Sequence, residues 1–279
     1  MKAGTIQEQV DLIREVFTYT HRFAEKTFVF HIDFAAIDTP LFAPLMKDLV
    51  LLHRAGIQVV LVPGARQRID EVLTQYAIGW KRVRGIRIAT PEQMPFIKMA
   101  AFDVANRLLT TLSEHRTNAV LGNWVRARAI GVEEGVDYQH AGHVERVQLD
   151  LLRNVLEDGL IPIFPCIGWS SSGQPYNISS RELATSISMS LAADKLFFIT
   201  STPGIDSGSY TLPEGVDIGT DGRISRMDVT QAKTFLKENR PDDGETDYTD
   251  YELLELAHRA AAQSVNRVHI LDGGVEGVV

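Results

Sequence analysis

The sequence predicts an α/β fold in which an open, mainly parallel sheet of about eight strands lies between helices. Residues 57–62 and 195–200 are mainly apolar without alternation, which is typical of strands that are covered on both faces of a parallel sheet. Leu183, Ile187 and Leu191 recur at helical spacing before the second of these strands. A Pro-Gly pair comes shortly after each strand. Together these features favour repeated units of helix and strand.

The composition is that of a folded protein with a full core. The chain has 279 residues, of which 44% are hydrophobic and 23% charged. Its net charge is −8 without a dense Lys/Arg cluster, which argues against nucleic acid as a main partner. No apolar run has the length of a membrane span, and the N-terminus lacks a signal-peptide pattern. We therefore expect a cytoplasmic protein with no membrane partner.

Thiol and metal chemistry are not expected. Cys166 is the one cysteine and lies in an apolar run, so we expect a buried, inert thiol. His140 and His143 have metal-ligand spacing, but no cysteine or further histidine is near them. Loop histidines are the favoured interpretation, with no metal site.

An amphipathic helix is predicted before the first strand. Ile6, Val10, Ile13 and Phe17 recur every three or four residues between polar ones. Their apolar face must pack on this domain's own surface or on a neighbouring subunit. We divide the chain into this helix, residues 1–25, and one domain over residues 26–279, with lobes over residues 26–175 and 176–279.

Two stretches in the first lobe could hold an anion. Pro63-Gly64-Ala65-Arg66 joins the strand over residues 57–62 to a helix, whose first amides have no partner within the helix. Residues 80–88 alternate and carry Lys81, Arg82, Arg84 and Arg87. The alternatives are a plain tight turn for the first stretch and a solvated strand face for the second.

The second half of the chain resembles a known family. Asn177, Ala184, Ala193-Asp194-Lys195-Leu196, Thr200 and Pro203-Gly204 together resemble the nucleotide-side signature of the amino-acid kinase family. Within it, the resemblance is closest to the kinase-like domain of N-acetylglutamate synthases and to acetylglutamate kinases. This resemblance implies the amino-acid kinase fold, which is carbamate kinase-like.

The resemblance also implies a ligand site. Gly64, Ala65 and Arg66 fall where acetylglutamate kinases hold the acetylated amino acid. Arg87, within Gly85-Ile86-Arg87-Ile88, matches the family arginine that grips the ligand's α-carboxylate, and Asn177 matches a ligand-binding asparagine. Bidentate guanidinium suits a carboxylate. L-glutamate or N-acetylglutamate is therefore the expected ligand.

The positions that carry phosphoryl transfer in the family hold other residues here. The kinase lysine falls on His31, and the glycines that follow it fall on Asp33 and Phe34. Two aspartates fall on Arg181 and Ser201. Phosphoryl transfer needs a cation that offsets charge and bare backbone that approaches the phosphoryl group. We therefore expect no catalytic residue and no cofactor in this chain.

The resemblance implies a regulatory and oligomerising domain of an N-acetylglutamate synthase, in arginine biosynthesis. Acetyl transfer from acetyl-CoA to glutamate would belong to a domain beyond Val279. One alternative is a divergent amino-acid or acetylglutamate kinase that recruits Lys195 or Arg66, and another is a scaffold without a ligand.

Assembly and an effector are implied as well. In arginine-sensitive relatives the leading helix interlaces dimers into a hexamer, so we expect a homo-oligomer. Tyr19, His269 and Gly273 match the region around the arginine site of those relatives, which makes L-arginine a possible effector. The chain ends at Val279 before the loop that completes that site, so we expect weak arginine binding.

Overall fold

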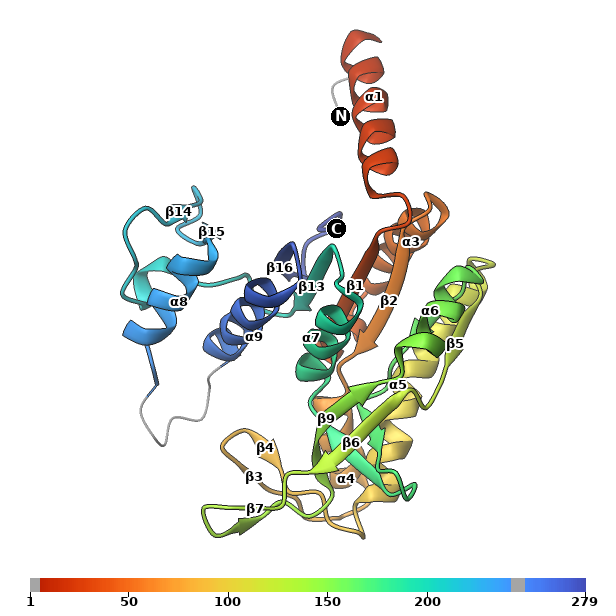
Figure 1. Cartoon of the computed structure of the whole chain (residues 1–279), viewed down its shortest axis with the longest axis vertical. Helices are drawn as coiled ribbons and strands as arrows, with labels where there is room; N and C mark the ends of the chain where they lie inside the picture. Colours follow the sequence, from red (N-terminus) through yellow and green to blue (C-terminus); the bar gives the residue numbers. More distant parts are fainter. Residues whose placement is uncertain (1–5, 242–248) are drawn as a thin grey trace.

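The computed structural model describes residues 6–241 and 249–279, and a parallel sheet forms its centre (Figure 1). Among these residues, six strands pair in the order β16-β13-β1-β2-β10-β5, all in parallel. Their bounds are β1 (Thr27–Ile32), β2 (Gln58–Pro63), β5 (Ala119–Leu121), β10 (Ile161–Ile163), β13 (Lys195–Thr200) and β16 (Arg267–Asp272). The predicted open, mainly parallel sheet is confirmed.

Helices cover both faces of this sheet. One face carries α3 (Phe42–Arg54), α4 (Arg66–Gln75) and α5 (Met94–Glu114), and the other carries α6 (Leu149–Glu157), α7 (Ser180–Leu191) and α9 (Thr249–Gln263). Phe28 and Phe30 of β1 join the first buried cluster, whereas Val29 joins the second. This burial on both sides is the physical reason why the strands do not alternate.

The main sheet has six strands rather than about eight because several short strands form a second, smaller sheet. β6 (Val125–Ala129), β9 (Ala141–Val147), β11 (Ile167–Trp169) and β12 (Pro175–Ile178) close on one another. Two hairpins lie beside it, β3 (Arg82–Val83) with β4 (Ile86–Arg87) and β7 (Val132–Glu133) with β8 (Val136–Asp137). The alternating basic stretch is therefore a hairpin and not a strand of the main sheet.

Two smaller pieces complete the described chain. A short helix, α2 (Phe34–Ile37), follows β1 directly. After β13, the chain forms η1 (Ser207–Ser209), a hairpin of β14 (Asp217–Ile218) and β15 (Ile224–Arg226), and α8 (Val229–Glu238). Phe235 is the buried centre of this piece, which packs on α9 through Leu254. The two predicted lobes share the main sheet, since β13 and β16 belong to the second lobe and pair with β1.

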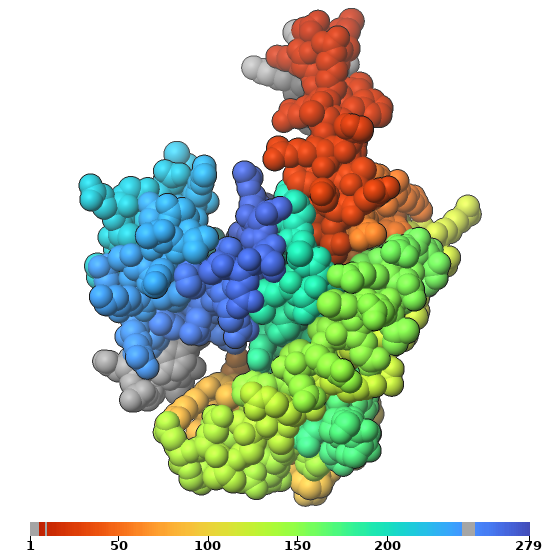
Figure 2. All heavy atoms as spheres, viewed as in Figure 1, coloured from red at the N-terminus to blue at the C-terminus, as the bar shows by residue number. Residues whose placement is uncertain are grey.

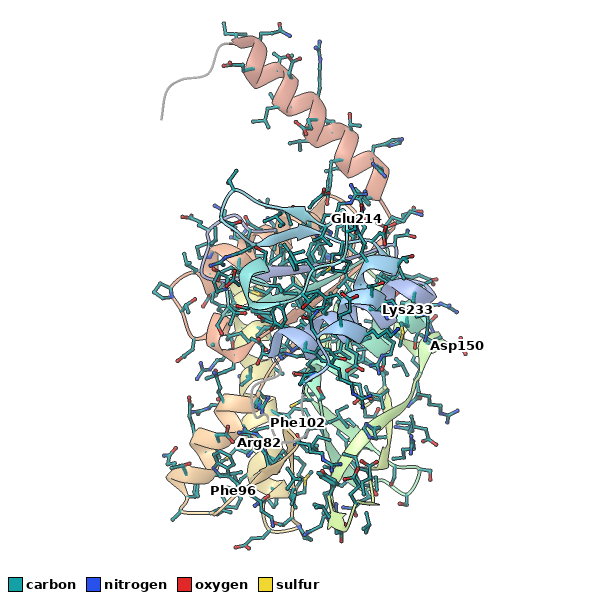
Figure 3. All side chains as sticks on the ribbon, turned by 90° about the vertical axis from the view of Figure 1, so that its left-hand side faces the viewer. Arg82, Phe96, Phe102, Asp150, Glu214 and Lys233 are labelled. Carbon is teal, nitrogen blue, oxygen red and sulfur yellow. The ribbon has the colours of Figure 1, made fainter. Side chains whose placement is uncertain are left out.

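The leading helix, α1 (Ile6–Phe23), projects away from the body of the molecule (Figures 1 and 2). Its apolar face is uncovered, with Ile6 81%, Phe17 70% and Ile13 54% exposed, and Figure 3 shows its side chains extending from a helix above the sheet. Only its last turn is anchored, where Phe23 is buried. The predicted helix is present, and this domain's own surface does not cover it.

His31 ties β1 to α7 beneath the carboxyl end of the sheet. Its side chain is fully buried, and its Nε2 lies 2.9 Å from Ser180 Oγ. Burial lowers the pKa of His31 to about 4, while the nearby Asp33 carboxylate opposes that shift. His31 is thus a buried, hydrogen-bonded strand residue whose ring is neutral near pH 7.

Acid should weaken the fold through His31. In the unfolded chain the His31 ring takes up a proton below about pH 6.5, whereas in the folded chain it stays unprotonated down to about pH 4. The free energy of unfolding should therefore fall as pH falls through this window, by on the order of 3 kcal/mol. Urea denaturation at several pH values measures it.

His31→Gln keeps a group that can bond Ser180 and removes the titration, so its pH slope should be shallower than that of the wild type. His21→Gln, at an exposed position of α1, is the matched control and should keep the wild-type slope. Equal slopes for all three proteins would contradict this role of His31.

Candidate ligand-binding cleft

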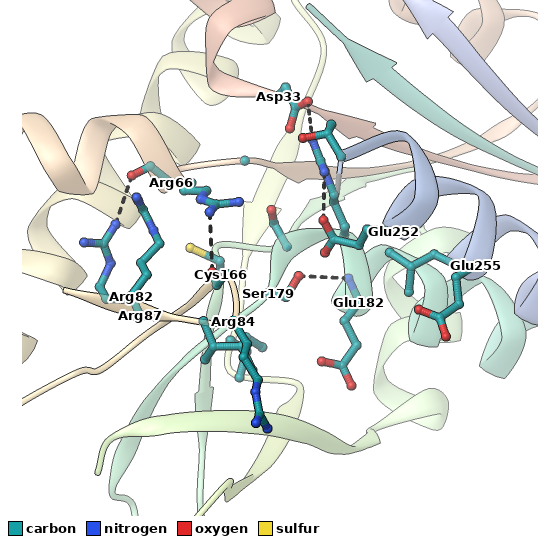
Figure 4. A pocket seen from close by; sticks show the side chains of 18 of the residues that line it. Asp33, Arg66, Arg82, Arg84, Arg87, Cys166, Ser179, Glu182, Glu252 and Glu255 are labelled. Carbon is teal, nitrogen blue, oxygen red and sulfur yellow. Dashed lines mark hydrogen bonds and ion pairs between the residues drawn. The ribbon is translucent and has the colours of Figure 1, made fainter. Parts of the chain in front are cut away.

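A cleft of about 1410 Å³ opens at the carboxyl ends of β1, β2 and β13 (Figure 4). This is where open α/β sheets bind ligands, because strand ends and helix N-termini meet there. Of the ten residues given as ligand-binding or substituted kinase positions, nine line it: Asp33, Phe34, Gly64, Ala65, Arg66, Arg87, Asn177, Arg181 and Ser201. His31 does not line it, since it is buried below the cleft and bonded to Ser180.

Arg66, Arg82 and Arg87 form a basic wall on one side of the cleft, and Arg87 is the most buried of the three. It is 5% exposed, and its Nη2 donates to Asp70 Oδ1 at 2.5 Å and to the Arg66 carbonyl at 3.2 Å. Its Nη1 is buried and has no hydrogen-bond partner among the described residues. Arg82 shares the Asp70 carboxylate, and both guanidinium groups lie over the Trp80 ring. Desolvation lowers the pKa of Arg87, and Asp70 opposes this shift.

Asp70 was not singled out from the sequence. It lies on α4, four residues after Arg66, so helical spacing places both near the start of that helix. An acidic residue in a helix is ordinarily solvated, however, and the hairpin that brings Arg82 and Arg87 to it comes later in the chain.

The glycine turn is needed for close packing. A Cβ at Gly64 would lie 3.3 Å from Asp33 Cα, and the Gly64 amide donates to the Ile32 carbonyl at 2.8 Å. That amide proton is therefore already used. Ala65 is buried, and the exposed Arg66 begins α4, so the first amides of α4 face the cleft region.

Arg181 holds the floor of the cleft through two carboxylates. Its Nη2 donates to Asp33 Oδ2 at 2.9 Å and its Nη1 to Glu252 Oε2 at 3.0 Å. The side chain is 14% exposed. The carboxylates of Asp33, which follows β1, and of Glu252, on α9, therefore compensate the positive charge of Arg181. Glu252 was not identified from the sequence because it lies 71 residues away from Arg181.

The remaining substituted positions leave little room beside β1. Phe34 is 5% exposed and begins α2, and the Arg107 guanidinium lies 5.3 Å from the centre of its ring. Ser201 follows Thr200, whose hydroxyl donates to the Thr202 carbonyl at 2.9 Å. The buried Phe34 side chain occupies the space directly after β1.

The histidines and the cysteine have local partners. His143 Nδ1 lies 3.2 Å from Glu182 Oε2, and His140 Nδ1 lies 3.0 Å from Gln174 Nε2. Within residues 6–241 and 249–279, no three His, Cys, Asp or Glu side chains are grouped as metal ligands would be. Burial raises the pKa of Cys166 to about 11, so the thiol is protonated near neutral pH, and the predicted burial of this cysteine is confirmed. None of the described helices combines the length and apolar character that crossing a membrane requires.

Two of the three effector candidates, Tyr19 and His269, lie near Lys195, which begins β13 at the other end of the sheet. The Lys195 ammonium donates to the Tyr19 hydroxyl at 2.8 Å and lies 4.4 Å from the ring centre of Phe23. The His269 ring stacks on Phe197 at 4.8 Å. Burial, followed by the charge of Lys195, lowers the pKa of His269 to about 4. Its buried Nε2 has no partner among the described residues.

Gly273 does not belong to this cluster. It follows β16, and its amide donates to the Thr200 carbonyl at 2.8 Å. A Cβ there would meet Ala36 Cβ at 2.8 Å and Ile199 at 3.0 Å. Gly273 therefore serves close packing near the cleft end of the sheet, whereas Tyr19 and His269 lie beside Lys195.

Comparison with known proteins matches residues 33–272 to the Amino acid kinase family. An amino-acid acetyltransferase of Ralstonia nicotianae is 33% identical over 208 residues, which are 71% of this chain and 46% of that protein. An amino-acid acetyltransferase of Shigella flexneri is 29% identical over 281 aligned residues, with shares of 98% and 61%. The chain thus spans roughly half the length of these relatives.

Solved structures agree with this relationship. N-acetylglutamate synthase from Neisseria gonorrhoeae, complexed with coenzyme A and N-acetyl-glutamate, aligns with a TM-score of 0.82 and 26% identity, over 96% of this chain and 59% of that one. Its complex with coenzyme A and L-arginine gives 0.81. Carbamate kinase from Giardia lamblia, at 12% identity and a TM-score of 0.62, shares the fold over 91% of this chain and 94% of that one. This chain belongs to the amino acid kinase family and is homologous to the kinase-like domain of N-acetylglutamate synthases.

Proposed function

We propose that this chain is a regulatory domain that binds amino-acid ligands and does not transfer phosphoryl groups. The observation that carries the proposal is the pairing of Arg181 with Asp33 and Glu252 on the cleft floor. Phosphoryl transfer needs cations that are free to stabilise developing negative charge. Both terminal nitrogens of Arg181 are engaged, and the three groups together carry one net negative charge, which repels a polyphosphate.

The competing kinase interpretation needs another cation in the cleft. Lys195 does not line the cleft, and its ammonium is held by Tyr19 at the opposite end of β13. Arg66 does line the cleft, together with Arg82 and Arg87. Arg181, the cation on the cleft floor, is already paired with Asp33 and Glu252, which disfavours this alternative.

The cleft suits a carboxylate. Arg87 lines it and has a buried Nη1 without a hydrogen-bond partner among the described residues, and the N-terminus of α4 adds partial positive charge. Buried guanidinium and carboxylate form strong charge-assisted hydrogen bonds. L-glutamate or N-acetylglutamate is the proposed ligand, with Asn177 lining the same space.

We further propose that the chain acts in a protein that makes N-acetylglutamate for arginine biosynthesis. Relatives named amino-acid acetyltransferase support this, and so does the solved synthase with coenzyme A. Acetyl transfer from acetyl-CoA to L-glutamate would be carried by a region of those relatives that this chain does not match. The cytoplasm is the proposed compartment.

The purified chain, mixed with Mg-ATP and either L-glutamate or N-acetylglutamate, should form no ADP that depends on the acid. His31→Lys should not restore activity, since Asp33 still faces the cleft and Arg181 stays paired. A coupled ADP assay measures both. ADP formation that rises with either acid, above the reaction without acid, would refute the proposal.

The exposed helix α1 is proposed to join copies of this chain and to contribute to an arginine site. Six large apolar side chains of α1 are uncovered: Ile6, Leu12, Ile13, Val16, Phe17 and Tyr19. Such a face normally packs on a partner. Tyr19 also reaches Lys195, whose ammonium has no acidic partner among the described residues, so an amino acid's carboxylate fits there.

Phe17→Glu should lower the mass seen by light scattering, because it places charge on the apolar face of α1. Thr18→Glu, on the neighbouring polar face, adds the same charge and should leave the mass unchanged. Identical masses for both variants would place the oligomer contact elsewhere.

Tyr19→Phe should reduce the thermal stabilisation of the chain by millimolar L-arginine. An unchanged arginine effect would remove Tyr19 from the effector site.

A further inference from the structure

The basic wall of the cleft carries more positive charge than its own carboxylate balances. Arg66, Arg82 and Arg87 line it, and Asp70 pairs with the last two. Arg66 donates only a long hydrogen bond, 3.4 Å, to the Gly85 carbonyl. Three guanidinium groups against one carboxylate leave an excess of two positive charges. This excess suits a ligand with two carboxylates.

Carboxylates line the other side of the same cleft. Asp33, Glu182, Glu252 and Glu255 line it, and Figure 4 shows Glu182 between the arginine side and Glu255. Arg181 compensates Asp33 and Glu252. Glu182 has only the His143 ring as a side-chain partner among the described residues, at 3.2 Å, and its carboxyl is 23% exposed.

Cations also line the far end of the cleft, and together with Arg181 they equal the four carboxylates in number. Lys237, Arg240 and Arg259 come from α8, the segment after it and α9, and they also line the cleft. They lie on the same C-terminal elements as Glu255 and can balance that carboxylate. Glu182 belongs instead to the first turn of α7. Glu182 is therefore the acidic group that is available to a ligand bound by the basic wall.

An acidic amino acid with a free ammonium group matches both sides. Its two carboxylates suit the excess charge of Arg66 and Arg87, and its ammonium suits Glu182. N-acylation turns the ammonium into a neutral amide, so Glu182 would face a group without positive charge. A charge-assisted hydrogen bond is roughly twice as strong as a neutral one, and its loss should cost about tenfold or more in affinity.

We infer that the cleft selects an unacylated acidic amino acid over its N-acylated form. Glu182 is the residue that binds the ammonium group in this inference. The inference rests on the proposed function of the cleft as a carboxylate site. It adds the class of ligand and a residue that determines the selection.

Calorimetric titration of the full chain with L-glutamate, N-acetyl-L-glutamate and glutarate tests this selection. L-glutamate should bind at least about tenfold tighter than the other two. Glu182→Gln, an isosteric change, should bring the affinities for L-glutamate and N-acetyl-L-glutamate to within about threefold. Arg66→Gln should weaken all three ligands, which places them in the cleft. Glu157→Gln removes an exposed carboxylate of α6 that does not line the cleft and is the control.

The possible failures differ. If N-acetyl-L-glutamate binds as tightly as L-glutamate, or if the preference persists in Glu182→Gln with an unchanged melting temperature, the selection by Glu182 is wrong while the carboxylate site stands. If none of the three acids binds, the carboxylate site itself is wrong, and this inference is wrong with it.

Discussion

The guanidinium of Arg181, held between Asp33 and Glu252, is the interaction on which the cleft depends. It joins the end of β1, the start of α7 and the start of α9. Removing one member of a largely buried charged group leaves the others uncompensated, which costs more than the contact itself contributes. The three residues therefore form a unit, and that unit occupies the place where a kinase of this fold would need a free cation and bare backbone.

One strand connects the two regions to which we assign ligands. β13 begins at Lys195, beside Tyr19 of α1, and ends at Thr200, next to the cleft. It pairs in parallel with β1 and β16 on its two sides, so its backbone position is fixed by hydrogen bonds along its length. A change in how α1 packs would act first on Lys195, while the cleft floor is held at the opposite end of the same sheet.

Local sequence patterns predicted the strands and helices. The partners of the cleft residues and the placement of whole elements depend on tertiary contacts. The apolar strands depend on neighbouring residues and could be predicted directly from the sequence. Arg87 and Asn177 were placed in the cleft by family resemblance. Asp70 and Glu252 could not be found, because each becomes a partner only when distant segments fold together. The uncovered state of α1 and the separation of Gly273 from Tyr19 likewise depend on how whole elements are placed.

The central claim is that Arg181, as a paired cation, leaves no site for a phosphate on the cleft floor. Calorimetric titration of Mg-ATP into the chain, beside the Arg181→Gln variant, tests it most directly. The account predicts no saturable binding of Mg-ATP up to millimolar concentration, either to the chain or to the Arg181→Gln variant. Saturable Mg-ATP binding that Arg181→Gln abolishes would contradict the account, because it would show that this guanidinium leaves Asp33 and Glu252 to hold a phosphate.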